Sequence, residues 1–160
     1  LGDVHGGAGE QTVELFELID QAGGVTSIPQ VLTEWQQQKT KFIPGFGHRF
    51  HKPEDPRAPR LLALVEKTRQ AGHCSGRFAD YAMAIQDELE KRKGTRLAMN
   101  IDGATAVIYA ELGFEAPLAR GLFCLSRSVG ILAHAWEQQQ QGGRNKGPTP
   151  PEYRWTYDAQ

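Results

Sequence analysis

Residues 42–57 carry more chemically useful side chains than a packed helix would. The stretch reads FIPGFGHRFHKPEDPR. Gly45 and Gly47 bracket an aromatic residue and would let the backbone approach a ligand closely, because glycine has no Cβ. His48 follows them, and histidine can donate or accept a proton near neutral pH. The pattern is typical of a catalytic loop, while composition alone leaves open a Pro/Gly loop whose charged residues face water.

Two further residues lie at expected helix starts, where the helix dipole would tune them. His5, in the phrase LGDVHGGAGE, precedes a helical pattern, and the positive end of a helix favours a neutral imidazole that can donate a hydrogen bond. The alternative for His5 is a simple capping role. Asp102 follows Asn100 at the start of an alanine-rich helix, where a carboxylate is held ionised, although a residue there can also serve merely as a cap.

The elements that would position these side chains are helices, and we expect an all-α protein. No strand pattern of convincing length and no repeat is present. Ser27 is the expected N-cap of one short helix, and Asp55 with Pro56 the cap and first turn of another that stops at Gly72. Two buried helical faces are predicted from their spacing: Val13, Phe16, Leu18 and Ile19; and Phe78, Tyr81, Ala82, Ile85 and Leu89.

A long helix is predicted from about Pro117 to Gln141. Its apolar residues occur nearly all round, so we expect it to be buried or to lie in a subunit interface. Arg127 within it needs an anionic partner or a route to solvent. The basic run from Lys91 to Arg96 most simply ends a helix, although it could also meet a phosphate.

Composition limits the function classes. The chain has 160 residues, enough for one domain or a domain and part of another, and its 18 Lys and Arg against 19 Asp and Glu give no overall electrostatic footprint for nucleic acid or a membrane. Its two cysteines, far apart, predict neither a disulfide framework nor a metal site, and fit a reduced cytoplasmic setting. We see no apolar run of membrane-spanning length and no leader. Because the chain starts at Leu1, in a glycine-rich phrase, we expect an N-terminal portion to precede it.

Three phrases together resemble the citrate synthase family: LGDVHGGAGE, PGFGHRFHKPEDPRA, and NIDGATAVIYAELGF followed by LSRSVGILAHAWEQ. The resemblance implies an almost wholly α-helical homodimer, in which a large domain and a smaller mobile domain close over oxaloacetate and coenzyme A. This chain would be the C-terminal portion. Residues 1–8 would belong to the large domain, 9–115 to the small mobile helical domain, and 116–160 to the large domain's long helix and tail.

The resemblance also implies a role for each matching residue. Asp102 would be the base that takes a proton from acetyl-CoA, His5 would stabilise the thioester oxygen, and His48 would hydrogen-bond the ketone of oxaloacetate. The substrate carboxylates would be held by arginines, namely Arg57, Arg127 and, as a partial substitute, Arg144. Coenzyme A would be received by Phe42, Ile43, Pro44, Gly45, Phe46 and Gly47, with Arg49 and Lys52 as weaker candidates. The implied chemistry needs no metal and no cofactor beyond the coenzyme A thioester.

Two departures from ordinary synthases point to one branch of the family. Gly103 directly follows Asp102, and residues 147–149, Gly-Pro-Thr, replace an arginine-proline-arginine phrase. The aspartate followed directly by glycine and the helix phrase RSVGILAHAWEQ look closer to citryl-CoA lyase and to the matching domain of ATP-citrate lyase, while the missing arginines argue against hydrolytic synthase activity. The predicted enzyme therefore makes or breaks the bond between acetyl-CoA and oxaloacetate, with a leaning toward citryl-CoA cleavage. The alternatives are an ordinary citrate or 2-methylcitrate synthase and a non-catalytic acyl-CoA-binding relative.

Overall fold

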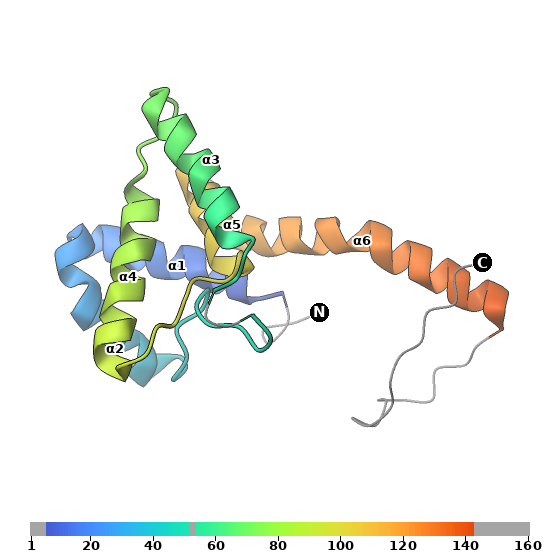
Figure 1. Cartoon of the computed structure of the whole chain (residues 1–160), viewed down its shortest axis with the longest axis horizontal. Helices are drawn as coiled ribbons and strands as arrows, with labels where there is room; N and C mark the ends of the chain where they lie inside the picture. The colour runs from blue at the N-terminus through green and yellow to red at the C-terminus, as the bar shows by residue number, and fades with distance from the viewer. Residues whose placement is uncertain (1–5, 52–53, 143–160) are drawn as a thin grey trace. The chain divides into compact units, whose positions relative to one another are not determined.

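The computed structural model describes residues 6–51 and 54–142 of the chain, and within these ranges it is helical (Figure 1). No strand is present within these ranges, where an isolated bridge pairs Phe46 with Met99, so the all-α expectation is confirmed. The elements in chain order are α1 (Ala8–Gln21), η1 (Gly24–Ser27), α2 (Ile28–Gln38), α3 (Ala58–Gln70), α4 (Arg77–Lys93), α5 (Ile101–Glu111) and α6 (Ala116–Gln141).

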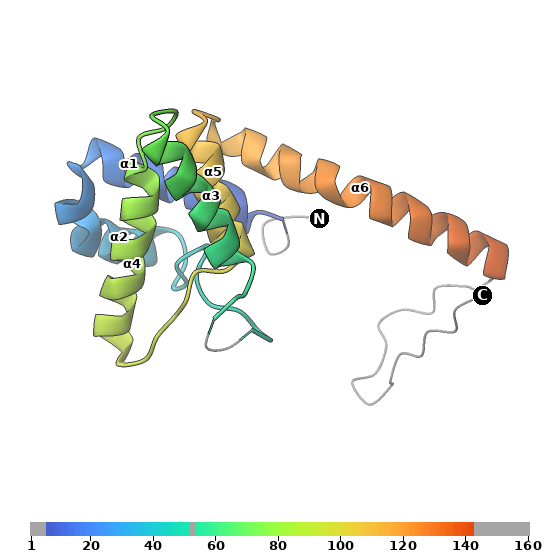
Figure 2. The same cartoon turned by 45° about the horizontal axis from the view of Figure 1, so that its top comes forward.

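The core forms where α5 packs against α1, α3 and α4 (Figures 1 and 2). The side chains that α5 buries are small, among them Ala104, Ala106 and Val107, and small side chains let neighbouring helices approach closely. The predicted α4 face is confirmed in full, since each of its residues is buried. On α1 the prediction is wrong for Leu18, which is 42% exposed. Leu15 is buried instead, because the face of α1 runs through Thr12, Leu15, Phe16 and Ile19 at helical spacing.

Two predicted helix starts differ from the structure in detail. Ser27 does precede α2, but its hydroxyl donates to the carbonyl of Gly24 at 2.7 Å and makes no capping bond to α2. The prediction that Asp55 and Pro56 begin α3 is wrong, because the helix starts at Ala58 with Arg57 as its N-cap residue. The carboxylate of Asp55 accepts hydrogen bonds from Arg57 instead, and this gives it a different role.

The chain separates into two compact units, residues 1–126 and 127–160, and α6 contributes to both. The expectation that α6 is buried is wrong within this chain: Leu125, Val129, Leu132 and Trp136 are each more than 60% exposed. Arg127 is exposed as well. The predicted domain limits at residues 8 and 115, and a subunit interface on α6, stay predictions.

By length and composition α6 could cross a membrane, so the expectation that no apolar run reaches that length is wrong. Its most apolar window has a mean hydropathy of 1.2, and 11% of that window is buried in the structure. A single helix that meets these criteria is weak evidence for a membrane span, because core helices of soluble proteins meet them too.

Candidate active site

The N-terminus of α5 is built around Asn100. Its backbone is extended, and its side-chain oxygen accepts hydrogen bonds from the N–H groups of Asp102, at 2.9 Å, and Gly103, at 3.1 Å. Such an N-cap supplies partners for amides that a helix start leaves without one. Asp102 therefore lies in the first turn of α5, where the helix dipole favours a negative charge.

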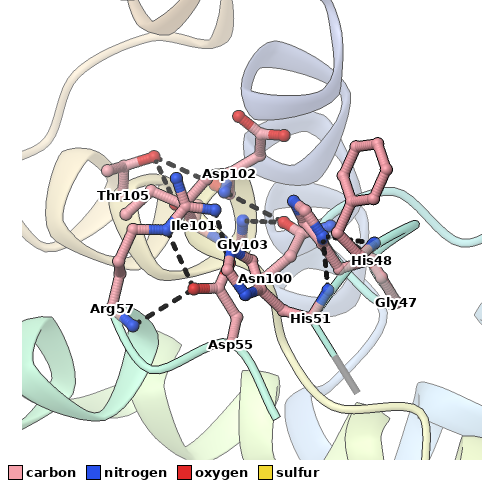
Figure 3. A network of polar contacts seen from close by, with 11 residues as sticks. Gly47, His48, His51, Asp55, Arg57, Asn100, Ile101, Asp102, Gly103 and Thr105 are labelled. Atoms are coloured by element: carbon pink, nitrogen blue, oxygen red, sulfur yellow. Dashed lines mark hydrogen bonds and ion pairs between the residues drawn. The ribbon is translucent and has the colours of Figure 1, made fainter. Parts of the chain in front are cut away.

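The glycine loop is fastened to the segment that leads into α5. Gly47 donates its N–H to the carbonyl of Ala98 at 2.8 Å, and Asn100 donates its N–H to the carbonyl of Gly45 at 2.9 Å. The Asn100 side-chain amide donates to the carbonyl of Gly47 at 2.7 Å. These bonds fix the backbone that leads into His48 and into Asp102, so the two side chains are held by one connected frame (Figure 3).

Gly45 and Gly103 are glycines because their backbones touch. Gly45 has a φ of +81°, and a Cβ on it would lie 2.8 Å from the Cα of Gly103 and 2.7 Å from the Thr12 hydroxyl. A Cβ on Gly103 would collide with the carbonyl oxygen of Gly45 and lie 2.7 Å from a side-chain carbon of Met99. The glycine after Asp102 thus has a packing reason within the fold.

His48 is held in one tautomer by its own loop. Its Nδ1 accepts the backbone N–H groups of Phe50 and His51, each at 3.0 Å. In the neutral ring the proton therefore lies on Nε2, which can donate a hydrogen bond to a ligand. The ring is half-buried, and the centre of the His51 ring lies 4.5 Å from its own.

Arg57 is held by Asp55 through two parallel hydrogen bonds. Its Nε and Nη2 donate to the two carboxylate oxygens at 2.9 and 2.8 Å. The paired guanidinium lowers the pKa of Asp55 far below its ordinary value, and the carboxylate raises the pKa of Arg57. The charge of Asp102 raises the pKa of Arg57 further, which places these two groups within electrostatic reach of each other.

A surface cavity of about 590 Å³ opens beside this frame. That volume lies in the range of small-molecule sites. Three titratable side chains of the loop, together with Arg96, face it: its lining is Gly47, His48, His51, Asp55, Thr95, Arg96, Leu97 and Ala98. Across residues 6–51 and 54–142, no three His, Cys, Asp or Glu side chains cluster closely enough to hold a metal ion.

The structure brings together three of the predicted site residues, His48, Arg57 and Asp102, around the start of α5. Arg127 lies in the second compact unit. His5, Lys52 and Arg144 fall outside the described residues. In the predicted coenzyme A loop, Ile43, Pro44, Gly45 and Phe46 are buried, whereas Phe42 and Arg49 are exposed.

Sequence reasoning missed two residues of the site, Asp55 and Asn100. Asp55 was interpreted only as a helix cap, and Asn100 only as a neighbour of Asp102. The side chain of each bonds to a backbone group on another segment, Asp55 to Ile101 and Asn100 to Gly47. One signal was available for Asp55, because an acidic residue two positions before a functional arginine is well placed to orient it.

Comparison with known proteins agrees with this architecture. The family model described as "Citrate synthase, C-terminal domain" matches residues 1–148. The chain belongs to the citrate synthase family. The citrate synthase of Acidithiobacillus ferridurans is 33% identical over 150 residues, which are 92% of this chain and 38% of that protein. The chain therefore spans well under half the length of this curated relative.

Solved structures from two branches of the family resemble the chain equally well. Citryl-CoA lyase from Hydrogenobacter thermophilus has a TM-score of 0.68 at 28% identity, covering 96% of this chain and 62% of that one. Citrate synthase from Thermoplasma acidophilum, solved with carboxymethyl-coenzyme A and oxaloacetate, has a TM-score of 0.67 at 25% identity. It covers 98% of this chain and 42% of that one. The citrate synthase fold is thus shown, and both activities occur among the relatives.

Proposed function

We propose that the protein makes or breaks the carbon–carbon bond between acetyl-CoA and oxaloacetate, and that it works mainly by cleaving citryl-CoA. The observation that carries the proposal is the joint placement of His48, Arg57 and Asp102 around the N-terminus of α5, each held by the chain's own hydrogen bonds. A donor, a cation and a carboxylate are what this chemistry requires.

Asp102 is the proposed proton carrier. In condensation its carboxylate takes a proton from the methyl group of acetyl-CoA, and the resulting enolate carbon attacks the ketone carbon of oxaloacetate. In cleavage the same bond breaks: the hydroxyl proton of citryl-CoA passes to the Asp102 carboxylate as the oxygen becomes the ketone, and Asp102 returns that proton to the enolate carbon to give acetyl-CoA. Cleavage consumes no water.

His48 and Arg57 are the proposed oxaloacetate ligands. The Nε2–H of His48 would donate to the ketone oxygen, where negative charge develops as the bond forms. Asp55 occupies the Nε and Nη2 edge of Arg57, and the opposite edge, at Nη1, is the one that can meet a substrate carboxylate. Arg127, Arg144 and His5 complete the proposed set, as the family resemblance implies.

Coenzyme A is the proposed second ligand, as a thioester substrate and not as a bound cofactor. The exposed Phe42 and Arg49 lie on the loop that the family resemblance assigns to it, and Arg96 lines the adjoining cavity. Guanidinium groups are suited to the phosphates of such a ligand. We further propose a cytoplasmic homodimer, with the exposed apolar residues of α6 in its interface.

The cleavage direction rests on the sequence around residue 147 and not on Gly103. The chain has Gly-Pro-Thr where ordinary synthases carry an arginine-proline-arginine phrase, and a citryl-CoA lyase is among its structural relatives. Gly103 does not discriminate between the activities, because its contact with Gly45 explains it. Ordinary citrate synthase activity is the second candidate, favoured by the curated relatives at about a third identity.

One experiment separates these activities. The protein at its natural length is given citryl-CoA in one reaction and acetyl-CoA with oxaloacetate in another, and acetyl-CoA and free thiol are followed in each. The proposal expects rapid acetyl-CoA formation from citryl-CoA with little thiol release. Rapid thiol release with slow acetyl-CoA formation would establish a synthase, and neither product in either reaction would leave a non-catalytic relative.

A further inference from the structure

We infer that Asp55 is a positioning residue that sets both the substrate-binding edge of Arg57 and the backbone that carries Asp102. The inference rests on the proposed function, since it concerns how that site is held. It adds a residue that touches no reacting atom.

Burial shows that Asp55 is more than a surface partner of Arg57. Its side chain is 1% exposed, and a carboxylate removed from water is costly unless its oxygens accept hydrogen bonds. Oδ1 accepts the backbone N–H of Arg57 at 3.1 Å as well as Nε. Oδ2 accepts Nη2 and, at 3.0 Å, the backbone N–H of Ile101.

These bonds join two segments that lie 46 residues apart in sequence. One is the start of α3, which carries Arg57, and the other is the start of α5, where Ile101 immediately precedes Asp102 (Figure 3). A shift of the Asp55 carboxylate would therefore move the cation and the proposed base together. Geometry at this level matters, because misplacement by about 1 Å can cost roughly 100-fold in rate.

The charge of Asp55 and its orienting effect on Arg57 should change substrate affinity in opposite directions. The Asp55 carboxylate neutralises Arg57 and repels a dicarboxylate, so its charge by itself weakens substrate binding. If neutralisation were its only effect, its removal would tighten binding. Orientation of the guanidinium has the opposite consequence, because a freely rotating arginine loses side-chain entropy when it binds. The sign of the effect on substrate affinity therefore tests the inference.

The chain offers a matched control in the ion pair of Arg69 and Asp80. Its Nη1 to Oδ1 distance is 3.0 Å, and the two side chains are 42% and 53% exposed. It joins α3 to α4 away from the frame of the proposed site. Exposed pairs of this kind contribute little to stability.

The experiment measures oxaloacetate binding by calorimetry, with the protein at its natural length. Four variants are compared with the unsubstituted protein: Asp55→Asn, Arg57→Gln, the double substitution, and Asp80→Asn. We expect Asp55→Asn to raise the dissociation constant about tenfold or more, because an amide cannot accept both guanidinium bonds. In the Arg57→Gln background the same change should raise the dissociation constant less than about twofold, since Asp55 acts through Arg57. Asp80→Asn should leave binding unchanged.

The outcomes separate this inference from the proposed function. Absence of oxaloacetate binding by the unsubstituted protein would overturn both. If the unsubstituted protein binds oxaloacetate and Asp55→Asn binds it equally or more tightly, the inference alone is overturned. The same holds if Asp55→Asn weakens binding equally with Arg57 present and with Arg57→Gln. If Asp55→Asn does not fold, Asp55→Glu keeps the charge but displaces the carboxylate. Weaker oxaloacetate binding by Asp55→Glu supports the inference, and unchanged binding overturns it.

Discussion

The start of α5 and the long helix α6 differ in how far the chain itself supplies contacts for their side chains. Around α5 the side chains of Asp55 and Asn100 are bonded to distant parts of the chain, His48 is bonded to its own loop, and two glycines permit close backbone contact. On α6 the large apolar residues Leu125, Val129, Leu132 and Trp136 are exposed, and Arg127 is exposed as well. Helices with this much exposed apolar surface ordinarily meet a partner.

We propose that the site has a part that the chain builds around α5 and a part, with Arg127 of α6, that the proposed homodimer would complete. His48, Arg57 and Asp102 are placed by bonds already present. Arg127 belongs to a helix whose apolar residues call for a further surface. Four predictions test this division, beginning with the largest expected effect.

Asp102→Asn tests the part that the chain builds. We expect turnover to fall about 100- to 10,000-fold, because the variant has lost its proton carrier. Oxaloacetate binding should stay within about twofold, since the carboxylate ligands are intact. Citryl-CoA cleavage and calorimetry measure the two quantities, and Asp87→Asn on the exposed side of α4 is the control. Equal losses of turnover and binding would contradict the assignment of Asp102.

Arg127→Leu tests the part of the site that the proposed homodimer would complete. The fold should tolerate leucine on this apolar helix, and oxaloacetate binding should weaken by about 2 to 5 kcal/mol, as for loss of one partner of a buried charge pair. Gln140→Leu, an exposed polar position on the same helix, controls for the added apolar surface. Unchanged affinity would mean that α6 contributes packing and no substrate contact.

Gly103→Ala tests the close backbone contact. The new Cβ would collide with the Gly45 carbonyl, so we expect the free energy of unfolding to fall by about 1 to 3 kcal/mol. Gly121→Ala is the matched control, because nothing lies within 4 Å of its added Cβ, and alanine there should stabilise the helix by up to about 1 kcal/mol. Urea denaturation measures both. If Gly103→Ala left the free energy of unfolding unchanged, the loop would not be closely packed on α5.

The Asp55 pair also predicts a small pH effect. The folded pKa of Asp55 lies below its ordinary value of 3.8, so its ionised form stabilises the fold at higher pH and this contribution is lost as the pH falls below that value. The unsubstituted protein should exceed Asp55→Asn in stability by on the order of 1 kcal/mol above pH 4, since the Arg57 partner is half-exposed. This difference in the free energy of unfolding should become smaller toward pH 2.5. A stability difference that does not change with pH would contradict a stabilising role for the ionised Asp55 carboxylate.

The sequence predicted those parts of the fold that depend on local periodicity. The buried face of α4 and the limits of α6 follow from helical spacing, and both are confirmed to within about a residue. Of the two alternatives predicted for α6, burial within the chain is wrong and a subunit interface stays a prediction, because an apolar helix indicates that a surface is covered but not by what. The motif phrases predicted the neighbourhood of His48 and Asp102, and the family is confirmed.

Long-range contacts explain what the sequence could not predict. The bond from Ile101 to Asp55 joins distant residues, and nothing local to either residue requires it. The contact of Gly103 with Gly45 likewise explains a glycine that had been attributed to the type of reaction. In each case the residue type follows from a neighbour that only the fold supplies.

The most direct test of the site is a crystal structure of the protein at its natural length with oxaloacetate and carboxymethyl-coenzyme A. We expect the ketone oxygen within hydrogen-bonding distance of His48 Nε2, a carboxylate on the Nη1 edge of Arg57, and the carboxymethyl group beside Asp102. A dicarboxylate bound away from His48 and Arg57 would contradict it.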